Sequence, residues 1–183
     1  GGTRGDLPAH DERGEVIWLQ GVEIPFVGVV ASGFVKMVRS SPSGQEMAVE
    51  VMGPGQVFGL LGTIDGSGCP LSARAVTPAW YIKANKGAMK RIYAETSALQ
   101  DQLVRRTTTR LRQAYDLMSH MSGGRVEQRL AAVLLLLSQS YGMEDGKDWV
   151  LTIPLTRADL AELAGTTVET AIRIMSRWQK DEM

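Results

Sequence analysis

Cysteine is nearly absent from this 183-residue sequence, in which Cys69 stands alone. A single thiol cannot form an internal disulfide, a four-thiolate iron–sulfur site or a structural zinc site. Long apolar runs are also missing, because the longest one, Leu130 to Leu137, falls far short of the roughly 18 residues that a membrane span needs. No charged and then apolar leader opens the chain. We therefore expect a cytoplasmic protein without a membrane partner.

The residue groupings that mark an enzyme are missing as well. Histidine occurs twice, as His10 and His120, and the sequence shows no histidine cluster, no metal-ligand spacing and no nucleophile–base pair. We therefore do not expect an enzyme. The formal net charge is zero, so overall charge does not indicate a nucleic-acid partner. The segment from Lys83 to Arg129, however, contains ten basic residues and four acidic ones. The sequence leaves open whether the basic residues form a solvated helix face or a binding surface.

What the sequence does contain first is a series of short strand patterns separated by glycine turns. Residues 15–21 and 72–84 have strand patterns, residues 27–40 are rich in β-branched side chains, and residues 45–52 alternate polar with apolar ones. Ser32-Gly33 supplies the positive φ that a tight turn needs. Such strands at regular intervals predict an antiparallel sandwich or barrel. The glycine-rich segment 53–73 can cradle an anion on its backbone N–H groups, which is a weak signal because such connections are common.

Helical periodicity replaces the strand pattern near Lys86. A narrow apolar stripe predicts a long helix from there to residue 122, with a seam that suits packing against another helix. A second helix, 125–141, has the apolar character of a core helix. Residues 142–148 predict a polar loop, and residues 149–153 a strand stopped by Pro154. The residues of the stripe are Val104, Thr107, Leu111, Ala114, Met118 and Met121.

Two short helices joined at Gly165 close the sequence. Thr156 with Asp159 predicts the start of the first helix, and Thr166 or Thr167 predicts the cap of the second. This is the pattern of a helix-turn-helix, whose second helix fits the roughly 12 Å wide major groove of DNA; an ordinary helix pair is the alternative. The residues expected on the buried side of the second helix are Ala171, Ile172, Met175 and Trp178. The residues expected to contact DNA are Glu169, Thr170 and Arg173 toward the bases and Thr156, Thr166, Thr167 and Arg177 toward phosphates.

Over about residues 14 to 183 the chain resembles the Crp/Fnr family of bacterial transcription regulators. The stretches that carry the resemblance are GEVIWLQG, SGFVKMVRSSPSGQEMAVEVMGPGQVFG, RLAAVLLLLS and IPLTRADLAELAGTTVETAIRIMSRWQKD. The resemblance implies an α+β fold with an antiparallel, jelly-roll-like β-roll (a double-stranded β-helix) that senses an effector over residues 1–85. A dimerisation helix over 86–122 and a winged helix-turn-helix over 123–183, truncated before the end of its wing, would follow.

The resemblance also implies partners. It predicts a homodimer that reads a palindromic promoter site through residues 167–178 and contacts RNA polymerase. Activation and repression both remain open. In the second helix Glu169 and Arg173 match the family pattern, whereas Ile172 replaces its serine or glycine. Isoleucine can touch a thymine methyl group but cannot donate a hydrogen bond, which leaves the first base of the half-site undefined.

The effector cassette departs from the cyclic-nucleotide-binding members of the family. Those members carry Gly-Glu-Leu and then Arg-Ser/Thr-Ala, where this chain has Gly59-Leu60-Leu61 and Leu71-Ser72-Ala73. Burying a phosphate without the guanidinium is costly, so we expect that cyclic AMP is not the effector. An apolar effector, an unknown one and none at all remain open, as does a cyclic-nucleotide-binding regulatory module that does not bind DNA. The residues of the expected pocket are Phe58, Gly59, Leu60, Leu61, Leu71, Ser72, Ala73, Arg110 and Leu111.

Two other cofactors of the family are also not expected. Oxygen-sensing members hold an iron–sulfur cluster on N-terminal cysteines, and haem-binding members use a histidine in the cassette region; this sequence has neither. We expect His10 to be solvated and His120 to be structural. Cys69 is either a redox sensor or an idle buried thiol, and the cofactor, if there is one, stays unknown.

Overall fold

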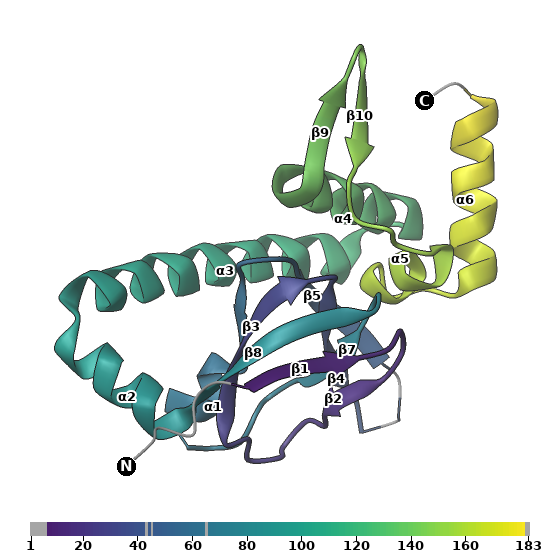
Figure 1. The fold of residues 1–183 in the computed structure, drawn as a ribbon. Coiled ribbons are helices and arrows are strands. Elements are labelled where there is room, and N and C mark those ends of the chain that lie inside the picture. The colour runs from purple at the N-terminus through teal and green to yellow at the C-terminus, as the bar shows by residue number, and fades with distance from the viewer. Residues whose placement is uncertain (1–6, 43, 45, 65, 182–183) are drawn as a thin grey trace. The chain divides into compact units, whose positions relative to one another are not determined.

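The computed structural model describes residues 7–42, 44, 46–64 and 66–181, and the chain divides into two compact units, Gly1–Thr109 and Arg110–Met183. Antiparallel strands come first, a long helix follows, and a helix-turn-helix ends the chain (Figure 1). The predicted α+β fold class is thereby confirmed. The division between the units falls inside the long helix, and the three-part division at residues 85 and 122 stays a prediction. Among the described residues, no helix has both the length and the apolar character to cross a membrane.

The first unit contains two four-stranded antiparallel sheets with the strand orders β1-β8-β3-β6 and β2-β7-β4-β5. The apolar core lies between them and includes Val30, Val35, Met37 and Met52. The strands span β1 Leu7–Asp11, β2 Val16–Trp18, β3 Phe26–Ser32, β4 Val35–Ser40, β5 Glu46–Met52, β6 Val57–Phe58, β7 Ser72–Ala75 and β8 Ala79–Asn85.

The turn at Ser32-Gly33 joins the two sheets. Gly33 has a φ of 76°, as the sequence predicts. The strands on either side of it, β3 and β4, belong to different sheets, so the turn is a corner of the roll. A Cβ on Gly33 would lie 2.2 Å from the carbonyl oxygen of Pro78, which explains why only glycine fits there.

Strand β1 was not expected from the sequence. It pairs with β8 at the edge of its sheet, where Pro8 is tolerated, and Asp11 accepts a hydrogen bond from the Tyr81 hydroxyl at 2.6 Å. Burial and the neighbouring Asp11 raise the pKa of Tyr81 well above its usual value. Tertiary pairing therefore creates a strand that local patterning does not encode.

The single helix expected over residues 86–122 consists of two helices, which corrects the prediction. Helix α2, Lys86–Glu95, follows the β-roll, and helix α3 runs over Ser97–Gly123. Between them Thr96 has extended backbone angles, φ −123° and ψ 96°, and its carbonyl accepts the N–H groups of Leu99 and Gln100 in the first turn of α3. A β-branched residue in an extended conformation ends one helix and allows the next to begin.

The predicted stripe on α3 is exposed in the isolated chain. Val104, Leu111 and Met118 retain 60%, 48% and 55% of their surface, Thr107 is exposed and Ala114 is partly buried. The side chain of Met121, the last residue of the stripe, lies outside the described residues.

In the second unit the last part of α3 is followed by helix α4, Val126–Tyr141, which lies close to its predicted bounds. Its buried side chains are Leu130, Val133 and Leu137, whereas Leu135 is exposed, so a stripe of this apolar helix rather than all of it is core. The expected loop 142–148 is wrong, because it forms most of a hairpin between β9, Gly142–Asp145, and β10, Asp148–Leu151. Gly146 supplies the positive φ of its turn. Helices α5, Arg157–Leu163, and α6, Val168–Lys180, follow.

Candidate nucleic-acid interface and effector pocket

Both predicted helix caps form in the helix-turn-helix. The Thr156 hydroxyl oxygen accepts from the Asp159 backbone N–H at 3.2 Å, while Asp159 accepts from the Thr156 N–H at 2.9 Å. These two bonds make the capping box that starts α5. Thr167 rather than Thr166 caps α6, because its hydroxyl oxygen accepts the Thr170 N–H at 3.3 Å. Gly165, with a φ of 59°, makes the turn between the helices.

Small residues let α5 and α6 pack closely. Three alanines at their contact are completely or almost completely buried: Ala161 in α5, Ala164 at the C-cap of α5, and Ala171 in α6. The expected burial of Ile172 is wrong: it is 36% exposed, and Ile174 is buried instead. Successive helical residues differ by about 100°, so positions 171, 174, 175 and 178 form one stripe and position 172 lies outside it. Because it lies outside the buried stripe, Ile172 is on the outer face of α6.

The outer face of α6 carries the two residues on which the DNA-binding prediction depends. Glu169 and Arg173 are exposed, and within the described part of the chain neither side chain has a hydrogen bond or an ion pair. Val168, which was not predicted from the sequence, lies beside them with 37% of its surface exposed. Its spacing of four residues from Ile172 could have revealed it. The first two turns of α6 therefore present an acid, a base and two apolar side chains to solvent.

Arg177 has a partner within the protein. Its guanidinium forms an ion pair with Glu127 of α4, and the same carboxylate accepts a hydrogen bond from the Trp178 indole N–H at 2.8 Å. The hydrogen bonds from Arg177 and Trp178 hold the pKa of Glu127 below its usual value. These contacts tie the later turns of α6 to α4, so the predicted phosphate contact of Arg177 would have to share its guanidinium with Glu127.

Arg129 supports the turn of the helix-turn-helix and was not predicted. Its guanidinium donates to the carbonyl oxygens of Ala164 at 3.0 Å, Gly165 at 3.1 Å and Gly124 at 3.3 Å. Two of these acceptors, the carbonyl oxygens of Ala164 at the C-cap of α5 and of Gly165 in the turn, have no hydrogen-bond partner within a helix. A cation inside the apolar sequence of α4 is the signal that could have identified it.

Aromatic side chains fill the interior of the β-roll next to the cassette. Phe58 is 1% exposed and stacks on Trp18 with ring centroids 5.2 Å apart. Tyr81 meets Phe58 edge-to-face at 5.4 Å. Gly59 has a φ of 80°, and a Cβ there would approach Trp18 and Ile24. The segment that would cradle a ligand is therefore packed against a dense aromatic cluster.

The expected pocket residues that belong to the first unit differ in exposure and in their contacts. Phe58, Gly59 and Ala73 are buried, whereas Leu61 is 56% exposed. The Leu71 carbonyl accepts the Trp18 indole N–H, and the Ser72 hydroxyl oxygen accepts the Gln20 N–H. Arg110 and Leu111 belong to the second unit, and their contact with a ligand stays a prediction.

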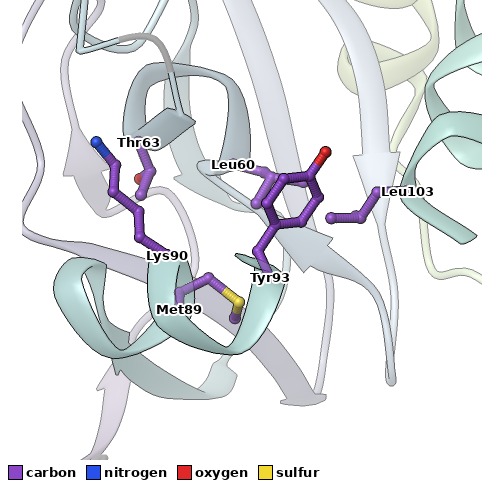
Figure 2. Close-up of a pocket in the computed structure, with 6 residues that line it drawn as sticks. All are labelled: Leu60, Thr63, Met89, Lys90, Tyr93 and Leu103. Carbon is purple, nitrogen blue, oxygen red and sulfur yellow. The ribbon is translucent and has the colours of Figure 1, made fainter. Parts of the chain in front are cut away.

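Leu60 faces a groove between helices. The groove has a volume of about 290 Å³ and lies between α1, Leu60–Ile64, and the helices α2 and α3 (Figure 2). The residues that line it are Leu60, Thr63, Met89, Lys90, Tyr93 and Leu103.

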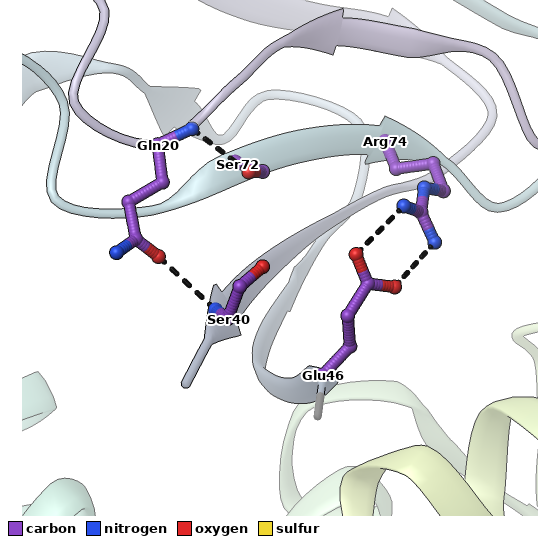
Figure 3. A network of polar contacts seen from close by, with 5 residues as sticks. All are labelled: Gln20, Ser40, Glu46, Ser72 and Arg74. Carbon is purple, nitrogen blue, oxygen red and sulfur yellow. Dashed lines mark hydrogen bonds and ion pairs between the residues drawn. The ribbon is translucent and has the colours of Figure 1, made fainter. Parts of the chain in front are cut away.

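Arg74, the arginine nearest the second cassette triplet, is engaged elsewhere. It donates to both carboxylate oxygens of Glu46 at 2.9 and 3.1 Å (Figure 3). Its neighbours on β7, Ala73 and Ala75, point into the core with 0% and 1% exposure. Because strand side chains alternate, Arg74 lies on the opposite face and cannot replace the guanidinium that Leu71 lacks.

Comparison with known families matches both units. Residues 10–96 match the cyclic nucleotide-binding domain, and residues 128–183 match the Crp-like helix-turn-helix domain. A CRP-like cAMP-activated global transcriptional regulator of Mycobacterium tuberculosis is 28% identical over 169 residues, which cover 92% of this chain and 75% of the relative. The transcriptional activator protein Anr of Pseudomonas protegens is 25% identical, covering 97% of this chain and 76% of that protein. These relatives are regulators rather than enzymes.

The solved structure of FixK2 from Bradyrhizobium japonicum has the same fold. It matches with a TM-score of 0.83 at 21% identity, over 97% of this chain and 86% of that one. A CooA mutant from Carboxydothermus hydrogenoformans matches with a TM-score of 0.79 at 16% identity, over 96% and 77% of the two chains.

Proposed function

Because the chain belongs to the Crp/Fnr family of transcription regulators, we propose that it acts in the cytoplasm as a homodimer that reads a palindromic promoter site through α6. The observation that carries this proposal is the exposed pair Glu169 and Arg173 on the first turns of a capped second helix, whose side chains have no partner among the residues that the structure describes. Base contacts in a helix-turn-helix come from this part of the second helix. Arg173 would donate two bonds to a guanine, and Glu169 would accept from a cytosine N4 amine.

The exposed stripe of α3 supports the dimer. Val104, Leu111 and Met118 repeat at a spacing of seven residues and are each about half exposed or more. An apolar seam of this kind pairs with a copy of itself in a two-stranded coiled coil. Two α6 helices then reach half-sites roughly 34 Å apart along one face of the DNA, as a palindrome requires. A dimer bound at a promoter contacts RNA polymerase, which the family resemblance also implies.

We propose further that cyclic AMP does not switch this regulator. Leucines occupy both positions of the charged ligands, and Arg74 is bound to Glu46 on the other face of its sheet. An effector that binds here is uncharged and shifts the population of dimers competent for DNA. We expect cyclic AMP to give no binding heat in a calorimetric titration and no rise in the thermal midpoint of unfolding in a melting experiment. Saturable binding would contradict this part of the proposal.

The experiment that tests the function is selection of binding sites from a pool of random duplexes by the 183-residue chain, followed by fluorescence anisotropy. We expect a two-fold symmetric consensus containing G·C pairs. Arg173→Ala removes one bidentate base contact from each half-site and should therefore lower affinity for it by about 30-fold or more. The matched control is Arg112→Ala, which removes from α3 another exposed arginine whose side chain has no partner in the described residues. Failure to enrich any duplex would favour the alternative, a regulatory module without DNA binding.

A further inference from the structure

Two apolar side chains lie side by side on the face of α6 that should meet DNA. Val168 and Ile172 are 37% and 36% exposed, although the buried side of the helix is supplied by Ala171 and Ile174. Residues four apart are neighbours on a helix surface. Both are β-branched, so each has a strongly preferred χ1 rotamer in a helix and presents its methyl groups in a defined direction.

The position of this apolar pair is fixed by the contacts that fix α6. Thr167 caps the helix directly before Val168, and Arg129 holds the carbonyl oxygen of Gly165 in the preceding turn. Glu169 and Arg173 each follow one member of the pair in the sequence. The apolar pair and the charged pair therefore occupy the same two turns.

The major groove offers one apolar group to such a surface, the C5-methyl group of thymine. Neither valine nor isoleucine has a side-chain donor or acceptor, so neither can recognise a base by hydrogen bonding. We infer that Val168 and Ile172 form an apolar reading pair that selects thymine methyl groups next to the G·C pair read by Glu169 and Arg173. This inference rests on the proposed function and specifies which bases the half-site contains.

The test removes the methyl groups from the DNA and leaves its hydrogen-bonding pattern unchanged. Each thymine of the selected duplex is replaced in turn by deoxyuracil, and affinity is measured by anisotropy at one fixed salt concentration. We expect one or two thymines in each half-site to matter, each replacement lowering affinity by about fourfold, as expected for one buried methyl-sized group. Replacement in both half-sites should lower it by about 16-fold.

Matched protein variants assign the effect to the two residues. Val168→Ala and Ile172→Ala should each abolish the thymine preference at one position and leave the preference at the other. Both side chains are exposed, so neither variant should change the thermal midpoint by more than about 2 °C. Ile172→Val, which keeps a β-branched methyl group, should keep part of the preference.

The outcomes separate this inference from the proposed function. Equal affinity for thymine and deoxyuracil duplexes, or a thymine preference that survives in both alanine variants, would overturn the apolar reading pair while sequence-specific binding stands. Failure to bind any selected duplex would instead contradict the proposed function itself.

Discussion

Replacement of Arg129 by methionine should destabilise the helix-turn-helix unit more than any comparable change of an exposed arginine. Methionine keeps the apolar stem and removes the guanidinium, which donates to three carbonyl oxygens at 3.0, 3.1 and 3.3 Å. A hydrogen bond with a charged partner contributes about 1.5–3 kcal/mol. Arg129 is only partly buried, so water replaces some of this. We expect a loss of about 2–4 kcal/mol in the free energy of unfolding.

Hydrogen exchange followed by mass spectrometry measures this loss in the second unit alone. Slowly exchanging amides of α5 and α6 report the free energy of opening that unit. They should exchange about 30- to 1000-fold faster in Arg129→Met, while peptides of the β-roll remain unchanged. Arg112→Met is the control, since Arg112 is exposed and has no partner in the described residues. A difference below about 0.5 kcal/mol between the two variants would refute the role assigned to Arg129.

Three further predictions concern other contacts. Gly33→Ala should destabilise the β-roll by about 3 kcal/mol or more in urea denaturation, because its Cβ meets the Pro78 carbonyl, whereas Gly14→Ala, with the same positive φ and open space around it, should cost only about 1–2 kcal/mol. Because the folded state lowers the pKa of Glu127, its contribution to stability is present at neutral pH and is lost as pH falls through that lowered value. Glu127→Gln should therefore show a shallower acid decline of the thermal midpoint than the parent. The raised pKa of Tyr81 gives the opposite pH dependence: its contribution to stability is present below about pH 10 and declines as pH rises above that value. Tyr81→Phe should remove this decline in urea denaturation measured at alkaline pH.

Local chemistry was sufficient to predict the helix-turn-helix. The caps at Thr156 and Thr167 and the turn at Gly165 each depend on residues within a few positions, and all three form. Strand β1 and the break at Thr96 could not be predicted in this way. The first exists because β8 offers an open edge, and the second because a single residue adopts an extended conformation between two stretches with the same helical pattern.

The candidate sites show the same limit. Sequence spacing correctly predicted that Glu169 and Arg173 point outward. It did not predict the orientation of α6 about its axis, which buries Ile174 and exposes Ile172. The partners of Arg129 lie 35 and 36 residues away for Ala164 and Gly165, so no local pattern reveals them. The cassette leucines were identifiable from the sequence, whereas their divergence toward core, groove and solvent depends on the packing of the roll.

Guanine methylation interference on the selected duplex tests whether Arg173 of α6 contacts a guanine, because this assay detects a single contact between the helix and a base edge. Methylation of guanine N7 blocks the acceptor that Arg173 would use. We expect that methylation of one guanine in each half-site interferes with binding of the parent chain and of Arg112→Ala, and no longer interferes with binding of Arg173→Ala. Interference that is unchanged in Arg173→Ala, or absent from both half-sites in the parent, would contradict it.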